Sequence, residues 1–259
     1  MARLCPSILG RRGQSRLYAG SLQPTLFRDV KQQRTRDNRI STLKKYLADL
    51  KNHGTILNNV PDYAREPLLQ HYGINTRWID LVDNIWIALW FACHTAHSTG
   101  PRSEYLHFEQ RNLKVVKDKK KKGDDAKKKI IDTKAYAYIV LISVDLAQDK
   151  YTPGYFAGSK TELVDLRVAV PSTFIRPHAQ HGLLTKAKRE SGLSLDYRKM
   201  IAGVIRVDLD DAIRWLGNGI LLTPHVLFPS PVYDYGYRDL LFYAPTTSMS
   251  IGSIQHIGT

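Results

Sequence analysis

Apolar and polar positions change period twice between residues 65 and 93. The first part, REPLLQHY, is helical in pattern, with Pro67 at a first-turn position that tolerates proline. Gly73 follows where a left-handed residue commonly closes a helix. Residues 74–82 then alternate in the way of a β-strand. The pattern predicts a helix, a glycine turn and a strand in quick succession.

The next element is a helix at 85–93, capped by Asp83 or Asn84 and apolar on every side. A helix with no polar face is predicted to be buried all round. Four polar residues nevertheless lie just before it. Because buried polar groups need partners or a purpose, we treat them as candidate site residues: His71, Thr76, Arg77 and Asp80.

The rest of the chain predicts further helices and strands. Residues 31–64 are polar and helical, with one apolar face formed by Ile40, Leu43, Tyr46, Leu47 and Leu50. Strands are predicted at 135–145, 162–170 and 202–207, and a helix that starts at Asp208 or Asp210 and stops at Gly217 or Gly219.

A second polar cluster lies in residues 172–186, STFIRPHAQHGLLTK, and consists of Arg176, His178, Gln180 and His181. Two histidines suggest a metal at first sight. Zinc sites, however, usually add cysteines or further carboxylates, and this segment has no cysteine and little carboxylate support. We therefore predict no metal.

Composition indicates a globular, intracellular protein. The 259 residues are 43% hydrophobic, which is enough for a substantial core in one large domain or two small ones. Cys5 and Cys93 are too few for a disulfide framework and fit a reducing compartment. The apolar run at 85–93 is too short to span a bilayer, and the N-terminus has no secretory pattern. We expect a cytoplasmic protein with no membrane partner.

The net charge of +14 favours a polyanionic partner. Residues 117–129 hold eight lysines and three aspartates, so this insertion supplies five of the fourteen charges. It is either a solvated loop or a phosphate-binding arm. The other nine charges are spread over the rest of the chain. Nucleic acid and an acidic neutralising protein both fit.

Four segments occur in the order found in the FRG-domain family, which this chain resembles. They are RLYAGSLQPTLFR (16–28), QHYGINTR (70–77), IRPHAQHGLLT (175–185) and VIRVDLDDAIRWLGNGI with LFP (204–220 and 227–229). The resemblance covers nearly the whole chain apart from the insertion at 117–129 and a tail at 245–259. We therefore expect one domain at 1–244 followed by a flexible tail.

One residue departs from the family pattern. Similar proteins usually carry arginine at the position of Ala19, between Tyr18 and Gly20. Either the arginine was lost naturally, or it was replaced deliberately to make a toxic enzyme expressible. Our hypothesis is the second, so that the chain is inactivated at Ala19.

The family resembles the ADP-ribosyltransferase superfamily, which implies an α+β fold: an ADP-ribosyltransferase-like split β-sandwich with flanking helices. NAD is the implied substrate. The resemblance places the catalytic residues at Ala19 (as arginine), His71 and Gln180. It places NAD-binding residues at Tyr18, Gly20, Arg28, Thr76, Arg77 and Asp80.

Each role has a structural alternative. Gln180 is expected to hold the ribose and His71 to accept the proton of the acceptor, because an unperturbed histidine titrates near neutral pH. Gln180 replaces the glutamate that many ADP-ribosyltransferases use. Arg77 anchors either a phosphate or the fold. Asp80 can simply cap the next helix, and Arg28 can hold the N-terminal segment.

The sequence thus favours an NAD-dependent ADP-ribosyltransferase toxin of a toxin–antitoxin or phage-defence type, acting on nucleic acid and on RNA ahead of DNA. An antitoxin protein is the expected partner. Alternatives are a protein-modifying transferase or NAD hydrolase and, from another class, a non-catalytic nucleic-acid-binding module.

Overall fold

The structure is a computed structural model that describes residues 4–7, 22–28, 30–53, 55–111, 135–145, 152–188 and 197–257, with backbone only at 4–7 and 53. Tyr18, Ala19, Gly20 and the lysine-rich insertion at 117–129 lie outside these residues. No helix of the described part is long and apolar enough to cross a membrane.

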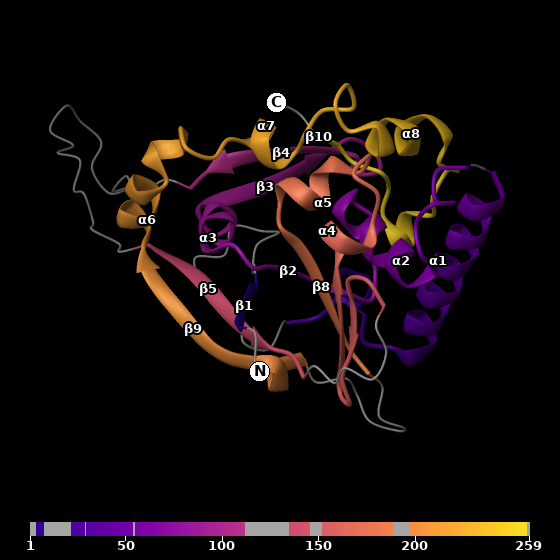
Figure 1. The fold of residues 1–259 in the computed structure, drawn as a ribbon, viewed down its shortest axis with the longest axis horizontal. Coiled ribbons are helices and arrows are strands. Elements are labelled where there is room, and N and C mark those ends of the chain that lie inside the picture. The colour runs from indigo at the N-terminus through magenta and orange to yellow at the C-terminus, as the bar shows by residue number, and fades with distance from the viewer. Residues whose placement is uncertain are drawn as a thin grey trace, which may run out of the picture.

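The described strands form two sheets (Figure 1). Neighbouring strands of the seven-stranded sheet are antiparallel, in the order β6-β7-β8-β2-β1-β5-β9. A three-stranded sheet has the order β10-β4-β3, with β10 parallel to β4. The bounds are β1 Leu4–Ser7, β2 Ile79–Val82, β3 His94–Thr99, β4 Tyr105–Gln110, β5 Tyr136–Ser143, β6 Tyr155–Ala157, β7 Thr161–Asp165, β8 Gly182–Ala187, β9 Ile201–Asp208 and β10 His256–Ile257.

Helices complete a mixed α+β fold, as predicted. The α-helices are α1 Gln33–His53, α2 Asp62–His71, α3 Ile85–Cys93, α4 Leu166–Ala169, α5 Ile175–Ala179, α6 Leu209–Trp215, α7 Pro224–Leu227 and α8 Tyr235–Tyr243. The 3-10 helices are η2 Thr25–Phe27, η3 Tyr197–Met200, η4 Gly217–Gly219 and η5 Met249–Ile251.

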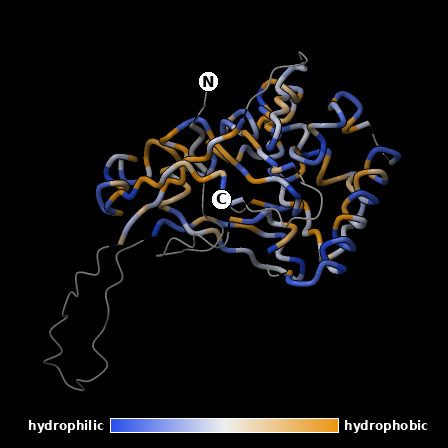
Figure 2. Tube along the Cα trace, turned by 90° about the horizontal axis from the view of Figure 1, so that it is seen from below, coloured by the Kyte–Doolittle hydropathy of each residue, from blue (hydrophilic) through white to orange (hydrophobic). Residues whose placement is uncertain are grey.

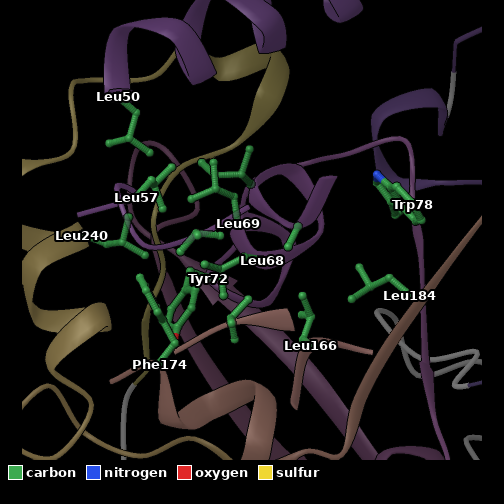
Figure 3. Close-up of a cluster of buried hydrophobic side chains, with 14 of the residues drawn as sticks. Leu50, Leu57, Leu68, Leu69, Tyr72, Trp78, Leu166, Phe174, Leu184 and Leu240 are labelled. Carbon is green, nitrogen blue, oxygen red and sulfur yellow. The ribbon is translucent and has the colours of Figure 1, made fainter. Parts of the chain in front are cut away.

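One hydrophobic core lies between α1, α2, α4, α8 and one face of the large sheet. Figure 3 shows Leu68, Leu69 and Tyr72 of the α2 region at its centre, with Leu50, Phe174 and Leu240 around them. The predicted apolar face of the 31–64 segment is confirmed, since Leu43, Tyr46 and Leu50 are buried there. Along the chain, apolar residues gather in the interior and polar ones at the periphery (Figure 2).

A second core surrounds α3, whose Trp90 is fully buried against Phe91, Phe108 and Phe228. The prediction of a buried helix at 85–93 is confirmed, although Ile85 and Trp86 in its first turn are exposed. Asn84 is the cap, because its Oδ1 accepts from the amides of Trp86 and Ile87. Asp83 is therefore left for other contacts.

Three local predictions differ from the structure. Pro67 lies inside α2, not in its first turn, because the helix already begins at Asp62. The strand expected at 74–82 is β2 at 79–82, since Ile74 pairs with Gly252 and the carbonyl of Thr76 accepts from the Leu26 amide. The strand expected at 162–170 ends at Asp165, where the side chain caps α4.

The segment expected to be a flexible tail is packed as far as residue 257. Ile251 is fully buried in the first core, and β10 pairs with β4. The carbonyl of Ile251 accepts from the Asn75 amide at 2.7 Å, and the Gln255 amide donates to the Tyr72 carbonyl at 2.8 Å. These contacts hold the loop after α2 in place.

Candidate functional site

His71 and Gln180 meet although 109 residues separate them. His71 ends α2 and Gln180 caps the C-terminus of α5, and His71 Nδ1 lies 3.1 Å from Gln180 Oε1. Gln180 Nε2 donates to the Leu227 carbonyl at 2.8 Å. Two of the three residues predicted to be catalytic are thus brought together.

These contacts fix the tautomer of the neutral His71 ring. A carbonyl oxygen only accepts hydrogen bonds, so the amide nitrogen of Gln180 must face Leu227 and its oxygen must face His71. His71 Nδ1 therefore carries the hydrogen. Gln180 is only 6% exposed, and both the oxygen and the nitrogen of its side-chain amide form hydrogen bonds within the protein, which orients His71. That role differs from the ribose contact expected from the sequence.

The ring of His71 lies against Gly182, the first residue of β8. A Cβ added at Gly182 would lie 2.7 Å from His71 Cε1 and 2.8 Å from Nε2. The register of β2 with β8 pairs Gly182 with Val82, and Leu184 with Asp80. Because paired residues of neighbouring strands point to the same face, His71 covers the sheet face that also carries Asp80.

Arg176 holds the backbone of His71 in place. It is fully buried, and its Nη1 donates to the His71 carbonyl at 2.8 Å. Its guanidinium carbon lies 4.5 Å from the ring centre of Tyr72 and 4.3 Å from that of Tyr237. Rings this close to a cation offset part of the cost of burying it.

Asp234 ties this region together. Its side chain is fully buried and accepts from the Tyr72 hydroxyl at 2.8 Å, the Arg176 amide at 3.0 Å and the Tyr237 amide at 2.9 Å. Burial, followed by the nearby Asp234 carboxylate, raises the pKa of Tyr72 well above its usual value. Tyr72 therefore stays neutral and donates.

A more exposed cluster lies at the end of the same strands. Asp83 follows β2, Asp165 ends β7 and His181 precedes β8. Arg167 joins them, with Nη2 at 2.7 Å from both Asp83 Oδ2 and Asp165 Oδ2. His181 Nδ1 lies 3.1 Å from Asp83 Oδ1. Hydrogen bonding to Asp165 is the main reason why the pKa of Arg167 is raised, so it stays a cation.

We call His71, Gln180, His181 and Asp83 the histidine end. Sequence reasoning proposed His71 and Gln180, placed His181 in a polar cluster without giving it a role, and missed Asp83 as a partner. The available signal was an aspartate beside an asparagine at the helix start, where one residue suffices as a cap. Arg167 and Asp234 were missed because each also binds partners that are distant in sequence, Asp83 for Arg167 and Tyr72 and Arg176 for Asp234.

A second polar group, which we call the Arg77 corner, consists of Glu66, Gln70, Thr76 and Arg77. Glu66 is buried, and its carboxylate accepts from the Arg77 amide at 2.9 Å and forms an ion pair with the guanidinium. Hydrogen bonding to Glu66 is the main reason why the pKa of Arg77 is raised. The guanidinium is thus used by the fold, in line with the structural alternative.

Thr76 is fully buried in this corner. Its hydroxyl donates to Gln70 Oε1 and accepts from the Trp78 amide at 3.2 Å, and its own amide donates to Thr25 Oγ1 at 3.1 Å. These contacts hold the loop between α2 and β2. Because Thr76 is fully buried and its hydroxyl is used in these bonds, it serves the fold.

The remaining predicted residues divide. Asp80 Oδ1 is buried and has no hydrogen-bond partner among the described residues. Asp80 lies within β2 and does not cap α3, a role that Asn84 fills. Arg28 is exposed, and its Nε donates to the Gln23 carbonyl at 3.4 Å. The backbone carbonyl of Arg28 accepts a hydrogen bond from the Arg39 guanidinium. In the described part of the chain, no group of three or more His, Cys, Asp or Glu side chains could hold a metal ion.

Comparison with known proteins gives one family. The family model of the FRG domain matches residues 10–100, which include Ala19, His71, Arg77 and Asp83. This confirms the resemblance to the FRG-domain family that the motifs at 16–28 and 70–77 predicted. Gln180 and His181 lie outside the matched residues. No curated protein and no solved structure matches the chain.

Proposed function

Starting from the FRG domain at residues 10–100, we propose that this protein is an NAD-dependent ADP-ribosyltransferase toxin that modifies nucleic acid, RNA in preference to DNA. The observation that carries the proposal is the hydrogen bond between His71 and Gln180 over Gly182. It joins two motifs of the family resemblance at one end of the sheet. We further propose that the α+β architecture is a variant of the split β-sandwich.

The residues present fit the ribose part of NAD. A ribose hydroxyl needs an acceptor, and the buried Asp80 Oδ1 has no hydrogen-bond partner among the described residues. We assign Asp80 to this hydroxyl, and the Ala19 position, when it is arginine, to the ribose or the pyrophosphate. His71 and Gln180 form a rigid wall on the sheet face that carries Asp80. Thr76 and Arg77 hold the loop between α2 and β2, so we no longer include them among the proposed NAD-binding residues.

The chemistry needs rigidity more than a strong nucleophile. When the nicotinamide–ribose bond breaks, positive charge develops on the ribose, so fixed dipoles and carboxylates near the sugar lower the barrier. Asp80 supplies negative charge, and the oriented His71–Gln180 pair supplies a dipole that does not have to reorganise. The bound NAD would bring the leaving group.

The acceptor is proposed from charge. Nine of the fourteen net positive charges lie outside the lysine-rich insertion, which favours a nucleic-acid substrate and an acidic antitoxin. We propose a cytoplasmic toxin of a toxin–antitoxin or phage-defence type. A protein-modifying transferase or NAD hydrolase would use the same NAD site.

The test is nicotinamide release from NAD by the Ala19→Arg protein, with RNA, DNA or neither present. Release with label transfer to RNA supports the proposal. Release without transfer to nucleic acid favours a protein-modifying transferase or an NAD hydrolase. Absence of release under all three conditions rejects the enzyme.

A non-catalytic nucleic-acid-binding module is the second candidate, favoured by alanine at position 19. It predicts RNA binding that is independent of NAD and unchanged by Gln180→Leu. Binding measured with fluorescent RNA at two salt concentrations separates it from the transferase.

A further inference from the structure

His181 is placed unlike the other histidine of the site. It lies in the tight turn between α5 and β8, where its amide donates to the His178 carbonyl at 3.2 Å. Its φ is 52°, a left-handed conformation that glycine or asparagine adopts at lower cost. Its side chain is 41% exposed. The turn therefore carries a strained, accessible histidine beside Gln180.

Asp83 orients this histidine. Nδ1 of His181 lies 3.1 Å from Asp83 Oδ1 and 3.3 Å from Arg167 Nη1. The two contacts exclude each other, because Nδ1 either donates to the carboxylate or accepts from the guanidinium. The contact with Asp83 is shorter, and Arg167 already donates to carboxylate oxygens of Asp83 and Asp165. Nδ1 therefore donates to Asp83, and Nε2 keeps its lone pair.

His71 is less suited to receive a proton from a large acceptor. Its Nε2 is buried, and Gln180 holds its Nδ1. The side chain of His181 is exposed, so a nucleic-acid base or hydroxyl can approach it from solvent. Both rings lie at the same end of the sheet, because Gln180 and His181 are consecutive and Gly182 lies beneath His71.

We infer that His181, oriented by Asp83, is the catalytic base that removes the proton from the acceptor, while His71 and Gln180 are positioning residues. This inference rests on the proposed transferase activity. The residue that accepts the proton, His181, then lies outside the matched residues 10–100, and its partner Asp83 lies within them.

The acceptor X–H attacks C1′ of the NAD ribose, and the C1′–nitrogen bond to nicotinamide breaks with its electron pair leaving on the nicotinamide nitrogen. The X–H proton moves to His181 Nε2, and the resulting imidazolium is stabilised by Asp83. Solvent then takes the proton. The products are ADP-ribosyl-X, nicotinamide and one proton.

The charged and titratable groups near His181 are Asp83 after β2, Arg167 on α4, Asp165 at the end of β7 and His178 on α5. Burial lowers the pKa of His178; among the smaller effects, Asp165 raises this pKa and Arg167 lowers it further. His178 Nε2 is buried, so it does not compete for the acceptor.

The test compares His181→Asn and Asp83→Asn in the Ala19→Arg protein, with His225→Asn on the exposed surface of α7 as the matched control. Asparagine suits the left-handed turn at 181, so the first variant keeps its fold, and a thermal melt checks this. Nicotinamide release without acceptor and label transfer to RNA are measured separately from pH 5 to 9.

We expect His181→Asn to lower transfer by about 10²–10⁴-fold, the usual worth of a general base. Release without added acceptor should stay within about tenfold, since water is then the nucleophile and bulk solvent can take its proton. Asp83→Asn should lower transfer and change its pH profile, and His225→Asn should change neither.

Equal transfer by His181→Asn and its parent would overturn the role of His181 while leaving the transferase intact. Equal losses of release and transfer would also overturn it, because a base for the acceptor affects transfer alone. Failure of the Ala19→Arg parent to release nicotinamide would reject the proposed function, and the role of His181 with it.

Discussion

The Arg77 corner and the histidine end both include residues of α2, and they use polar groups in opposite ways. In the corner, the side chains of Glu66 and Arg77 pair with each other, and the Thr76 hydroxyl contacts Gln70 Oε1 and the Trp78 amide. At the histidine end, Gln180 orients His71, while His181 and Asp83 are about 40% exposed. A polar residue next to an apolar segment can therefore serve the fold or the chemistry, and its partners decide which.

The largest expected effect is on the corner. Arg77→Leu should lower the free energy of unfolding by about 3–5 kcal/mol, because it leaves the buried Glu66 carboxylate without its partner. Urea unfolding measures the loss. The double variant with Glu66→Leu is the control and should recover most of it. A stable Arg77→Leu protein that fails to bind NAD would instead make Arg77 a phosphate anchor.

At the histidine end, Gln180→Leu should cost about 1–3 kcal/mol, since the Leu227 carbonyl and His71 Nδ1 lose their partner. In the Ala19→Arg protein, Gln180→Leu should lower the rate of nicotinamide release by a larger factor than it lowers the fraction of folded protein. Retention of full release would remove the His71–Gln180 pair from the site.

Gly182→Ala sharpens the comparison because its methyl group would press mainly on His71, with the Pro177 carbonyl next at 3.2 Å. The added methyl overlaps the imidazole, and overpacking of this kind costs about 1–3 kcal/mol. We expect weaker nicotinamide release and a shifted His71 ring signal in NMR spectra. Gly203→Ala is the matched control, since a Cβ there meets only a Leu141 methyl group at 3.8 Å. An unchanged His71 signal would contradict the proposed packing.

His181→Asn should change stability by no more than about 0.5 kcal/mol, because the side chain is exposed and asparagine tolerates its backbone. The same urea measurement applies. A loss comparable with that of Arg77→Leu would make His181 part of the structural network.

The smallest effect is on acid stability. Burial lowers the pKa of His94 and of His178 in the folded state, so the unfolded chain binds more protons below the usual histidine pKa of about 6.5. Stability should therefore decline as the pH falls through about 6.5, and His178→Asn should reduce the decline. A pH-independent unfolding free energy between 7 and 5 would contradict this.

Local pattern predicted the elements that local chemistry determines. The helix at 85–93 and the strand at 135–145 are present in the structure, and each helix cap is one of the two residues predicted for it, Asn84 and Asp208. Their formation depends on residues within one or two turns, which is information that the sequence carries directly.

The differences come from long-range contacts. Residues 74–78 leave the strand pattern because Leu26 and the segment around Gly252 pair with them. Arg176 and Asp234 join α5 to α8 across 58 residues. The order of the motifs was enough to predict His71 and Gln180 as candidates. Only the structure shows that Asn84 caps α3, which leaves Asp83 to contact His181.

The most direct test of the account is nicotinamide release from NAD by three proteins: Ala19→Arg alone, with Gln180→Leu, and with His225→Asn. The account predicts release by the first and third and a large loss in the second. No release by the first protein, or equal release by all three, would contradict the claim that NAD is cleaved at the His71–Gln180 pair.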